Sequence, residues 1–382
     1  MSPINTVYFS LGSNLGNRLE HLQQSIFLLG KHIGKVKELS KIYQTASWGF
    51  KGDDFLNMCV CLETQMDASE VLDRILDIEK KMGRDRTGSA SSYVSRNVDI
   101  DVIFFNRDVT DSDTLTVPHK KIQERRFVLR PLADIAPQFY HPILKKDIRN
   151  LLQECKDTSA IDKTELRLFK SREALFSKME FIAIEGNIGA GKTSLAQKIA
   201  IDFNAKLVLE RFADNPFLPN FYQDQARYAF PLEMSFLADR YQQFSDDTSQ
   251  YDLFKNFMVS DYDIFKSLIF AKVTLQKDEF ILYRKIFDFM YKEVKKPRIY
   301  VFLYQTTERL LENIKKRGRD YEQDIKPDYL EKINRGYFDY IKGFPELNSL
   351  VIDISNRDFL SSQDDYEYIL IAIQNYALAQ LN

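Results

Sequence analysis

The sequence predicts an α/β protein with two domains, a compact α/β sandwich followed by a parallel sheet wrapped by helices. Three observations support this prediction. The chain has 382 residues, which is enough for two domains of ordinary size. An apolar segment typical of a strand runs into a glycine twice, at residues 7–12 and 181–186. In both halves, further strand patterns alternate with amphipathic helical patterns, as in α/β proteins.

The first half continues with two helical and two strand patterns. In each helical pattern, apolar side chains recur every three or four residues, whereas the strand patterns are short and apolar. They predict helices at 17–30 and 69–82 and strands at 56–62 and 98–105. A charged segment with weak periodicity follows, which is typical of a domain connection. We therefore predict a first domain at 1–157, a linker at 158–178 and a second domain at 179–382.

The second half begins with a buried strand pattern that leads directly into a helix. The predicted elements are strands at 180–185, 299–304 and 350–354, a helix from residue 192, and long aromatic-rich helices over 215–295. Apolar strands that alternate with helices favour a parallel sheet covered on both faces.

Composition excludes several classes of protein. With 53 Lys and Arg against 55 Asp and Glu, the formal net charge is −2, whereas a dedicated nucleic-acid binder is strongly basic. The three cysteines do not form a disulfide framework. No run approaches 18 apolar residues, and the first residues lack a signal-peptide pattern. We expect a cytoplasmic protein that acts on small molecules and binds neither nucleic acid nor membrane.

Residues 186–193, Gly-Asn-Ile-Gly-Ala-Gly-Lys-Thr, match the phosphate-binding pattern G-x-x-x-x-G-K-[ST]. The match lies between a predicted strand and a predicted helix, the context that the pattern requires, which disfavours a chance glycine-rich turn. Lys192 would reach the β- and γ-phosphates of ATP, and Thr193 would ligate one magnesium ion. The predicted nucleotide-binding residues are Gly186, Asn187, Gly189, Gly191, Lys192 and Thr193.

Asp99 and Asp101 lie two residues apart on a predicted strand of the first half, so their carboxylates share one face. Two neighbouring carboxylates are costly without a compensating cation, which makes this strand a natural magnesium site. A strand with a polar exposed face is the alternative. Nearby cations suited to a triphosphate favour the metal site; they are Arg84, Arg96, His119 and Arg125.

The second half resembles the deoxynucleoside kinase family over about 180–382. The resemblance rests on the glycine-rich loop and on the segments LERFADNPF at 209–217, YAFPLE at 228–233 and RGRDYE at 317–322. It implies ATP-dependent 5′-phosphorylation of a deoxynucleoside and a homodimer formed through this half. By position in the motifs, it also implies Glu210 as general base, Arg317 and Arg319 at the transferred phosphoryl group, and Tyr222 and Glu322 at the sugar 3′-hydroxyl.

Two positions depart from the family pattern. Glu233 stands where many members have a base-recognising Gln, and a carboxylate that only accepts hydrogen bonds favours an amino-bearing base, adenine or cytosine. In the acidic-Arg-Ser motif, Asp261 keeps the carboxylate at the nucleoside and magnesium site, but Tyr262 replaces the arginine. We expect a kinase with deoxyadenosine as substrate; the alternative is a nucleotide-binding or dimerising module.

The first half, over 5–155, resembles the hydroxymethyl-dihydropterin pyrophosphokinase family of folate biosynthesis, which has a ferredoxin-like α/β fold. The matching segments are LGSN at 11–14, DFLN at 54–57, GRDR at 83–86, SRNVDIDVI at 95–103, VPH at 117–119 and ERRFVLRPL at 124–132. The resemblance implies transfer of pyrophosphate from ATP to 6-hydroxymethyl-7,8-dihydropterin, with AMP as the other product.

By position, the resemblance assigns two magnesium ions to Asp99 and Asp101. It assigns the pterin to an aromatic pair, Phe55 and Phe127, and to the polar side chains of Thr45 and Asn57. The residues that it places at ATP and its phosphates are Glu79, Arg84, Arg96, His119 and Arg125.

Overall fold

The computed structural model describes residues 3–382, apart from 48–51, 84–95, 212–214, 250–253 and 345–346. The chain divides into two compact units, Met1–Leu175 with Leu378–Asn382, and Phe176–Ala377. The domain boundaries that we predicted at 157 and 179 stay predictions. In the described part of the chain, none of the helices has the length and apolar character needed to span a membrane.

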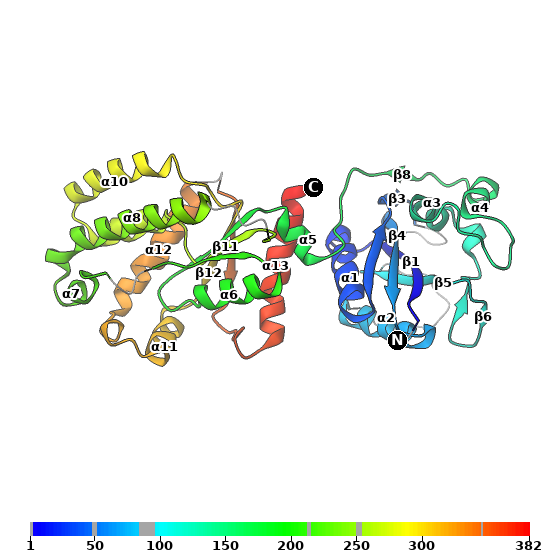
Figure 1. The fold of residues 1–382 in the computed structure, drawn as a ribbon, viewed down its shortest axis with the longest axis horizontal. Coiled ribbons are helices and arrows are strands. Elements are labelled where there is room, and N and C mark those ends of the chain that lie inside the picture. Colours follow the sequence, from blue (N-terminus) through cyan, green and yellow to red (C-terminus); the bar gives the residue numbers. More distant parts are fainter. Residues whose placement is uncertain (1–2, 48–51, 84–95, 212–214, 250–253, 345–346) are drawn as a thin grey trace. The chain divides into compact units, whose positions relative to one another are not determined.

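An antiparallel sheet forms the centre of the first unit (Figure 1). Its strands are β1 (Asn5–Ser13), β2 (Lys35–Leu39), β3 (Tyr43–Thr45), β4 (Phe55–Thr64), β5 (Asp99–Phe105) and β8 (Asp162–Lys163). They follow the order β5-β1-β4-β3-β8, with β2 also paired to β4. A separate hairpin joins β6 (Thr110–Asp111) to β7 (Thr116–Val117).

Helices cover both faces of this sheet (Figure 1). They are α1 (Arg18–His32), α2 (Ala68–Lys81), α3 (Arg126–Ile135), α4 (Ile148–Glu154) and the short η1 (Ile122–Glu124). Both α1 and α2 pack against the sheet and against each other, whereas α3 packs against β4. On β1, Val7, Phe9 and Leu11 are completely buried at alternate positions, as a strand with one core face requires. The predicted α/β sandwich is confirmed.

The second unit is built on a five-stranded parallel sheet in the order β10-β11-β9-β12-β13. Its strands are β9 (Phe181–Gly186), β10 (Lys206–Val208), β11 (Met258–Ser260), β12 (Ile299–Tyr304) and β13 (Ser349–Asp353). Every residue of the central strand β9 is buried, as expected for a sheet covered on both faces. The predicted parallel sheet is therefore confirmed.

The helices of the second unit surround this sheet (Figure 1). They are α5 (Arg172–Ser177), which begins in the preceding unit, α6 (Lys192–Asp202), α7 (Leu218–Gln223), α8 (Gln225–Ser249), α9 (Lys266–Thr274), α10 (Lys277–Tyr291), α11 (Thr307–Arg317), η2 (Asp320–Glu322), α12 (Pro327–Gly343) and α13 (Gln363–Leu381). The expectation of helix throughout 215–295 was wrong at β11. Three apolar and small residues are too few to show a period of two, and their pairing with β9 decides their conformation.

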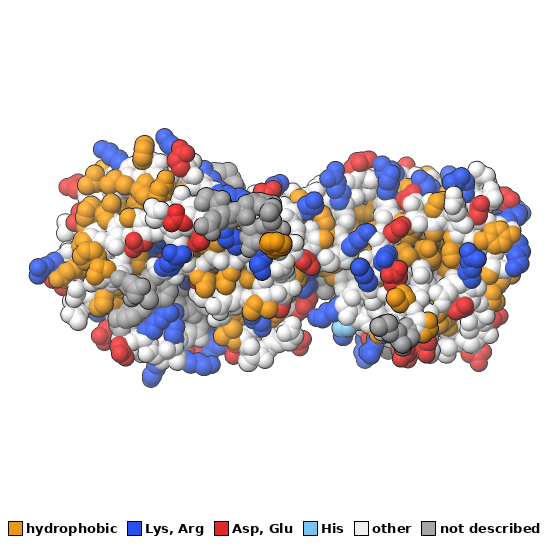
Figure 2. Space-filling model, in the orientation of Figure 1, with side chains coloured by type: hydrophobic (Ala, Val, Ile, Leu, Met, Phe, Trp, Pro, Cys, Tyr) orange, Lys and Arg blue, Asp and Glu red, His pale blue; other side chains and the backbone are white. Residues whose placement is uncertain are grey.

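Exposed apolar side chains are concentrated on α10. Ile281, Leu282 and Phe289 are 46%, 51% and 78% exposed, although Tyr283 and Phe287 on the same helix are buried in the core. Figure 2 shows hydrophobic side chains gathered over α8 and α10. Such a patch is more typical of an interaction surface than single exposed apolar residues are.

Candidate active sites

The first unit has a cavity on one face of its antiparallel sheet, with a volume of about 560 Å³ that includes space open to solvent. Strand register creates it: Gly12 lies opposite Asn57 on one side and Asp99 on the other, and Ser10 lies opposite Asp101. Because side chains alternate along a strand, these residues share a face. The lining residues are Ser10, Gly12, Thr45, Ala46, Phe55, Asn57, Arg96, Asp99, Asp101, Arg125 and Phe127.

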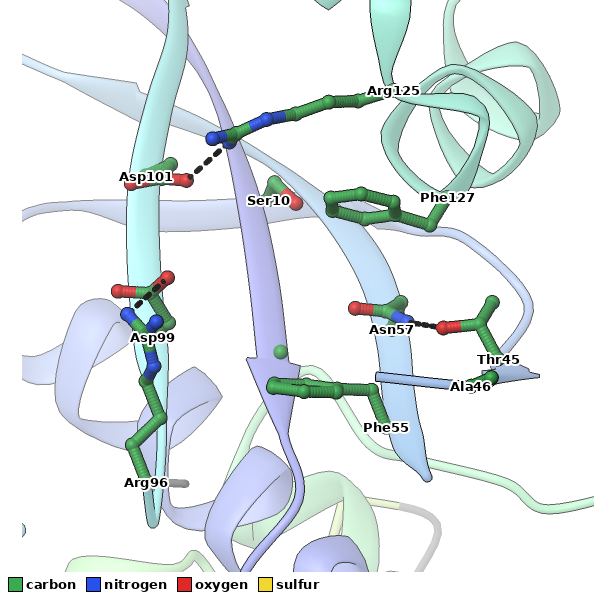
Figure 3. A pocket seen from close by; sticks show the side chains of 11 residues that line it. Ser10, Thr45, Ala46, Phe55, Asn57, Arg96, Asp99, Asp101, Arg125 and Phe127 are labelled. Atoms are coloured by element: carbon green, nitrogen blue, oxygen red, sulfur yellow. Dashed lines mark hydrogen bonds and ion pairs between the residues drawn. The ribbon is translucent and has the colours of Figure 1, made fainter. Parts of the chain in front are cut away.

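Two aromatic rings face each other across this cavity. Figure 3 shows Phe55 and Phe127 on opposite sides of an opening, with Asn57 and Thr45 beside it. The Asn57 amide donates a hydrogen bond of 2.8 Å to the Thr45 hydroxyl, which orients the amide toward the opening. A side chain at Gly12 would place its Cβ 3.0 Å from Asn57 Oδ1 and 3.4 Å from the Phe55 ring, so the Asn57 side chain would have to shift to accommodate it. The space fits a flat heteroaromatic ring with a polar edge.

Two ion pairs form the acidic side of the cavity (Figure 3). Arg96 Nη1 lies 2.8 Å from Asp99 Oδ2, and Arg125 Nη1 lies 3.3 Å from Asp101 Oδ2. Burial and the neighbouring Asp99 carboxylate raise the pKa of Asp101 to about 6. Keeping both carboxylates ionised in this site costs free energy, and a bound divalent cation would offset that cost. The residues present therefore fit magnesium.

The other predicted residues of this site have different positions. His119 Nε2 lies 3.4 Å from Arg125 Nη1, and burial together with Arg125 lowers its pKa to about 4, so its ring is neutral at pH 7. Glu79 is buried on α2 and accepts a hydrogen bond from the Ile100 backbone N–H, between the two aspartates, rather than lining the cavity. Arg84 lies outside the described residues. Ser10, which also lines the cavity, was not predicted from the sequence. Its position two residues before Gly12 on β1 places it on the same face of the sheet, which could have indicated it.

The second unit has a larger cavity, about 810 Å³ including space open to solvent, at the carboxyl end of its parallel sheet. Strand β9 ends at the glycine-rich loop, β10 ends just before Glu210, and β11 ends just before Asp261. The lining residues are Ile188, Gly189, Lys192, Thr193, Glu210, Leu218, Phe221, Tyr222, Leu232, Glu233, Phe236, Arg240, Asp261, Lys266, Phe270, Arg317, Arg319, Glu322 and Tyr329.

The glycine-rich loop has the backbone of a phosphate cradle. Gly189 and Gly191 have φ values of +83° and +86°, which favour glycine, and Gly186 has a φ of +155°. Lys192 begins α6 and donates a hydrogen bond of 2.9 Å to the Asn187 carbonyl, so its ammonium lies over the loop. The Asn187 side chain is buried and donates hydrogen bonds to α12, which fixes the loop against that helix.

Thr193, Asp261 and Glu210 form one chain of hydrogen bonds at the carboxyl edge of the sheet. The Thr193 hydroxyl donates to Asp261 Oδ2, and the Glu210 backbone N–H donates 2.8 Å to Asp261 Oδ1. Burial raises the pKa of Asp261. A hydroxyl and a carboxylate beside a phosphate cradle are donors that magnesium accepts, so these residues also fit the ion.

The Glu210 carboxylate is held by two cations that sequence reasoning missed. Arg240 Nη2 lies 2.6 Å from Oε1, and Lys266 Nζ lies 2.6 Å from Oε2. Although burial opposes ionisation, Lys266 and Arg240 hold the pKa of Glu210 well below its usual range. A signal for Arg240 existed, because it follows Glu233 by seven residues and therefore shares its face of α8. The sequence offered no comparable signal for Lys266.

The predicted nucleoside residues surround the rest of the cavity. Tyr222 packs against Phe221 with ring centroids 5.3 Å apart. Glu322 forms ion pairs with both Arg317 and Arg319, the latter at 3.3 Å. Glu233 is 2% exposed; its Oε1 accepts a hydrogen bond of 3.0 Å from Thr274, and its Oε2 is buried without a partner among the described residues. Burial raises the pKa of Glu233 to about 7.

Comparison with known proteins gives two family matches. The model of the 7,8-dihydro-6-hydroxymethylpterin-pyrophosphokinase family matches residues 8–137, and that of the deoxynucleoside kinase family matches residues 182–377. The chain is 38% identical to the Bacillus subtilis 2-amino-4-hydroxy-6-hydroxymethyldihydropteridine pyrophosphokinase over 35% of its length and 80% of that protein. It is 39% identical to the Bacillus subtilis deoxyguanosine kinase over 50% of its length and 93% of that protein.

A solved structure of deoxyadenosine kinase from M. mycoides with bound dATP matches 51% of this chain and 98% of its own, at 23% identity and a TM-score of 0.45. The family matches and the two Bacillus relatives cover the two halves of the chain in turn. This protein is therefore a transferase with two kinase units that belongs to the 7,8-dihydro-6-hydroxymethylpterin-pyrophosphokinase family through its first half and to the deoxynucleoside kinase family through its second.

Proposed function

We propose that this chain catalyses two separate ATP-dependent reactions, pyrophosphoryl transfer to 6-hydroxymethyl-7,8-dihydropterin in folate biosynthesis and 5′-phosphorylation of a deoxynucleoside, with deoxyadenosine as the preferred substrate. The observation that carries the proposal is that each unit has its own cavity in which carboxylates and cations adjoin a site for a flat ring or a phosphate. We also propose a cytoplasmic location, which three cysteines without disulfides support.

In the first unit, the pterin ring would stack between Phe55 and Phe127, with its polar edge on Asn57. Its hydroxymethyl oxygen would then attack the β-phosphorus of ATP, and AMP would leave. Arg96 and Arg125 would turn from their aspartates to the phosphates, because guanidinium groups bind phosphate oxygens with two parallel hydrogen bonds. Two magnesium ions held by the aspartates would neutralise the charge of the triphosphate.

In the second unit, the glycine-rich loop and Lys192 would hold the β- and γ-phosphates of ATP. The ionised Glu210 would accept the proton of the 5′-hydroxyl as that oxygen attacks the γ-phosphorus. Arg317 and Arg319 would leave Glu322 for the transferred phosphoryl group, and Glu322 and Tyr222 would bind the sugar 3′-hydroxyl. One magnesium ion held by Thr193, with Asp261 beside it, would offset the phosphate charge.

The base would lie against Glu233, whose buried Oε2 has no hydrogen-bond partner among the described residues. When ionised, this oxygen would accept a hydrogen bond from the amino group of adenine or from the N1–H and amino groups of guanine; when protonated, it would donate one to a ring nitrogen of the base, such as N1 of adenine. The related Bacillus protein is named a deoxyguanosine kinase, which supports a purine. Measured kcat/KM values for the four deoxynucleosides test this choice. A preference for thymidine would contradict it, and no turnover at all would favour a nucleotide-binding or dimerising module.

Two substitutions in the full chain test whether the reactions are separate. Asp99→Ala should abolish pterin pyrophosphorylation and leave deoxynucleoside phosphorylation unchanged, and Lys192→Ala should do the opposite. In each variant, the unaffected reaction shows that the other unit is folded and active. Loss of both activities in either folded variant would contradict the proposal of independent sites.

We further propose a homodimer formed through the second unit. The exposed apolar side chains of Ile281, Leu282 and Phe289 on α10 support it, because a second copy would bury them. Light scattering on the purified chain should give twice the monomer mass. Asp substitutions at Ile281 and Phe289 together should give the monomer, and an unchanged dimer would place the interface elsewhere.

A further inference from the structure

The position of the missing motif arginine cannot supply a charge to the second cavity. Tyr262, which stands there, is completely buried, and its ring packs edge-on against Phe244 at a centroid distance of 6.0 Å. Its hydroxyl is buried without a hydrogen-bond partner among the described residues. The side chain therefore belongs to the core beneath the cavity, and any cation with the arginine's role must come from another position.

Lys266, four residues further along the chain than Tyr262, brings a cation to Glu210. It is the first residue of α9, and its side chain is only 8% exposed. The ammonium lies 2.6 Å from Glu210 Oε2 and 5.4 Å from the centre of the Phe270 ring, which is one turn later on the same face. Burying a lysine this deeply costs free energy unless its ammonium is paired with an opposite charge. The Lys266 side chain lines the second cavity, where its ammonium pairs with Glu210.

The two carboxylate oxygens of Glu210 are held from two different helices. Arg240 on α8 binds Oε1, and its other nitrogen donates a hydrogen bond of 2.7 Å to the hydroxyl of Ser267, which follows Lys266. Lys266 on α9 binds Oε2. Because each oxygen has its own partner, the plane of the carboxylate cannot rotate without breaking an ion pair. Without Lys266, only the Oε1 side would be held.

We propose that Lys266 is the positioning residue that aims Glu210 at the acceptor hydroxyl, in place of the arginine that the family motif carries four residues earlier. This inference rests on the proposed kinase function of the second unit. The ammonium also offsets a carboxylate that must remain charged in a cavity receiving a triphosphate, where two negative groups would otherwise repel each other. Lys192 does not have this role, because its ammonium donates a hydrogen bond to the glycine-rich loop.

Steady-state kinetics of full-length Lys266→Met, with deoxyadenosine and saturating magnesium ATP, test the proposal. We expect kcat to fall by about 100-fold, the lower range for a misplaced general base, while KM for deoxyadenosine changes less than about threefold. Lys266→Arg restores a cation of similar reach and should recover most of kcat. Lys272→Met on the same helix is the matched control, since Lys272 is 60% exposed and should leave kcat unchanged. Pterin pyrophosphorylation by each variant checks the concentration of active chain.

The outcomes separate this inference from the function on which it rests. An active wild type with an unaffected Lys266→Met variant overturns the inference alone. Equal losses of kcat in the Met and Arg variants also overturn it, because packing rather than charge would then matter. A wild type that phosphorylates none of the four deoxynucleosides overturns the proposed function and the inference with it. If Lys266→Met does not fold, Lys266→Gln, which keeps a polar tip, is compared with Lys266→Arg under the same criteria.

Discussion

Glu233 gives the sharpest quantitative prediction, because the second unit buries this carboxyl with one oxygen unpaired. Burial raises its pKa from 4.5 to about 7, although Arg240 and Lys266 oppose the rise. Between these two pH values the unfolded chain has released the proton that the folded chain still holds. Stability that is present at low pH is therefore lost as the pH rises from 4.5 through about 7. At about 1.4 kcal/mol for each pH unit, the full loss is about 3.5 kcal/mol.

The Glu233→Gln variant isolates this contribution, because glutamine has the shape of the protonated acid and does not titrate. Between pH 5 and pH 8, the wild type should lose about 2–3 kcal/mol of unfolding free energy relative to the variant. Urea unfolding read by pulse proteolysis, with fragments of residues 176–377 identified by mass spectrometry, confines the measurement to the second unit. Glu331→Gln, on the exposed face of α12, is the matched control and should show no such trend. A constant difference between wild type and Glu233→Gln at all pH values would refute the reasoning, since Glu233 would then be ionised in the folded protein.

Three further predictions concern the cavities. Phe127→Ala should weaken pterin binding by about 10- to 100-fold in calorimetry, through loss of stacking and apolar contact; unchanged affinity would contradict the aromatic pair. At limiting magnesium, pterin pyrophosphorylation should decline as the pH falls through about 6, where Asp101 takes up a proton, and a flat profile from pH 5 to 8 would show that this carboxylate is not needed in its charged form. Gly191→Ala should lower deoxynucleoside phosphorylation by at least about tenfold and spare the pterin reaction, because its φ is +86° and the new Cβ would lie 2.9 Å from the Phe359 ring. Gly343→Ala, with no atom within 4 Å of the new Cβ, should behave as wild type.

Features set by neighbouring residues could be predicted from the sequence. The glycine-rich loop needs only its own spacing and the strand and helix beside it, so its backbone was foreseeable. The shared face of Asp99 and Asp101 follows from the period of a strand, and the structure places both in the cavity. The fold class followed similarly from alternating patterns of apolar residues.

Features that depend on distant contacts could not be predicted in the same way. The ion pairs of Glu210 join three segments that the sheet and helices bring together, and no local pattern distinguishes Lys266 from the many other lysines. The three-residue strand β11 depends on its neighbours in the sheet. The position of Glu79 against the Ile100 backbone depends on how α2 packs beside β5. Each of these features is decided by tertiary packing rather than by propensity.

The ion pairs of Glu322 have a consequence for the order of events in the second cavity. A single carboxylate holds Arg317, at the end of α11, and Arg319, next to η2, so three charged groups occupy one short stretch of backbone. Binding of a sugar hydroxyl to this carboxylate would therefore weaken both ion pairs at once. The position of the acceptor and the position of the two guanidinium groups would then be coupled, so that the arginines would respond to the sugar as well as to ATP.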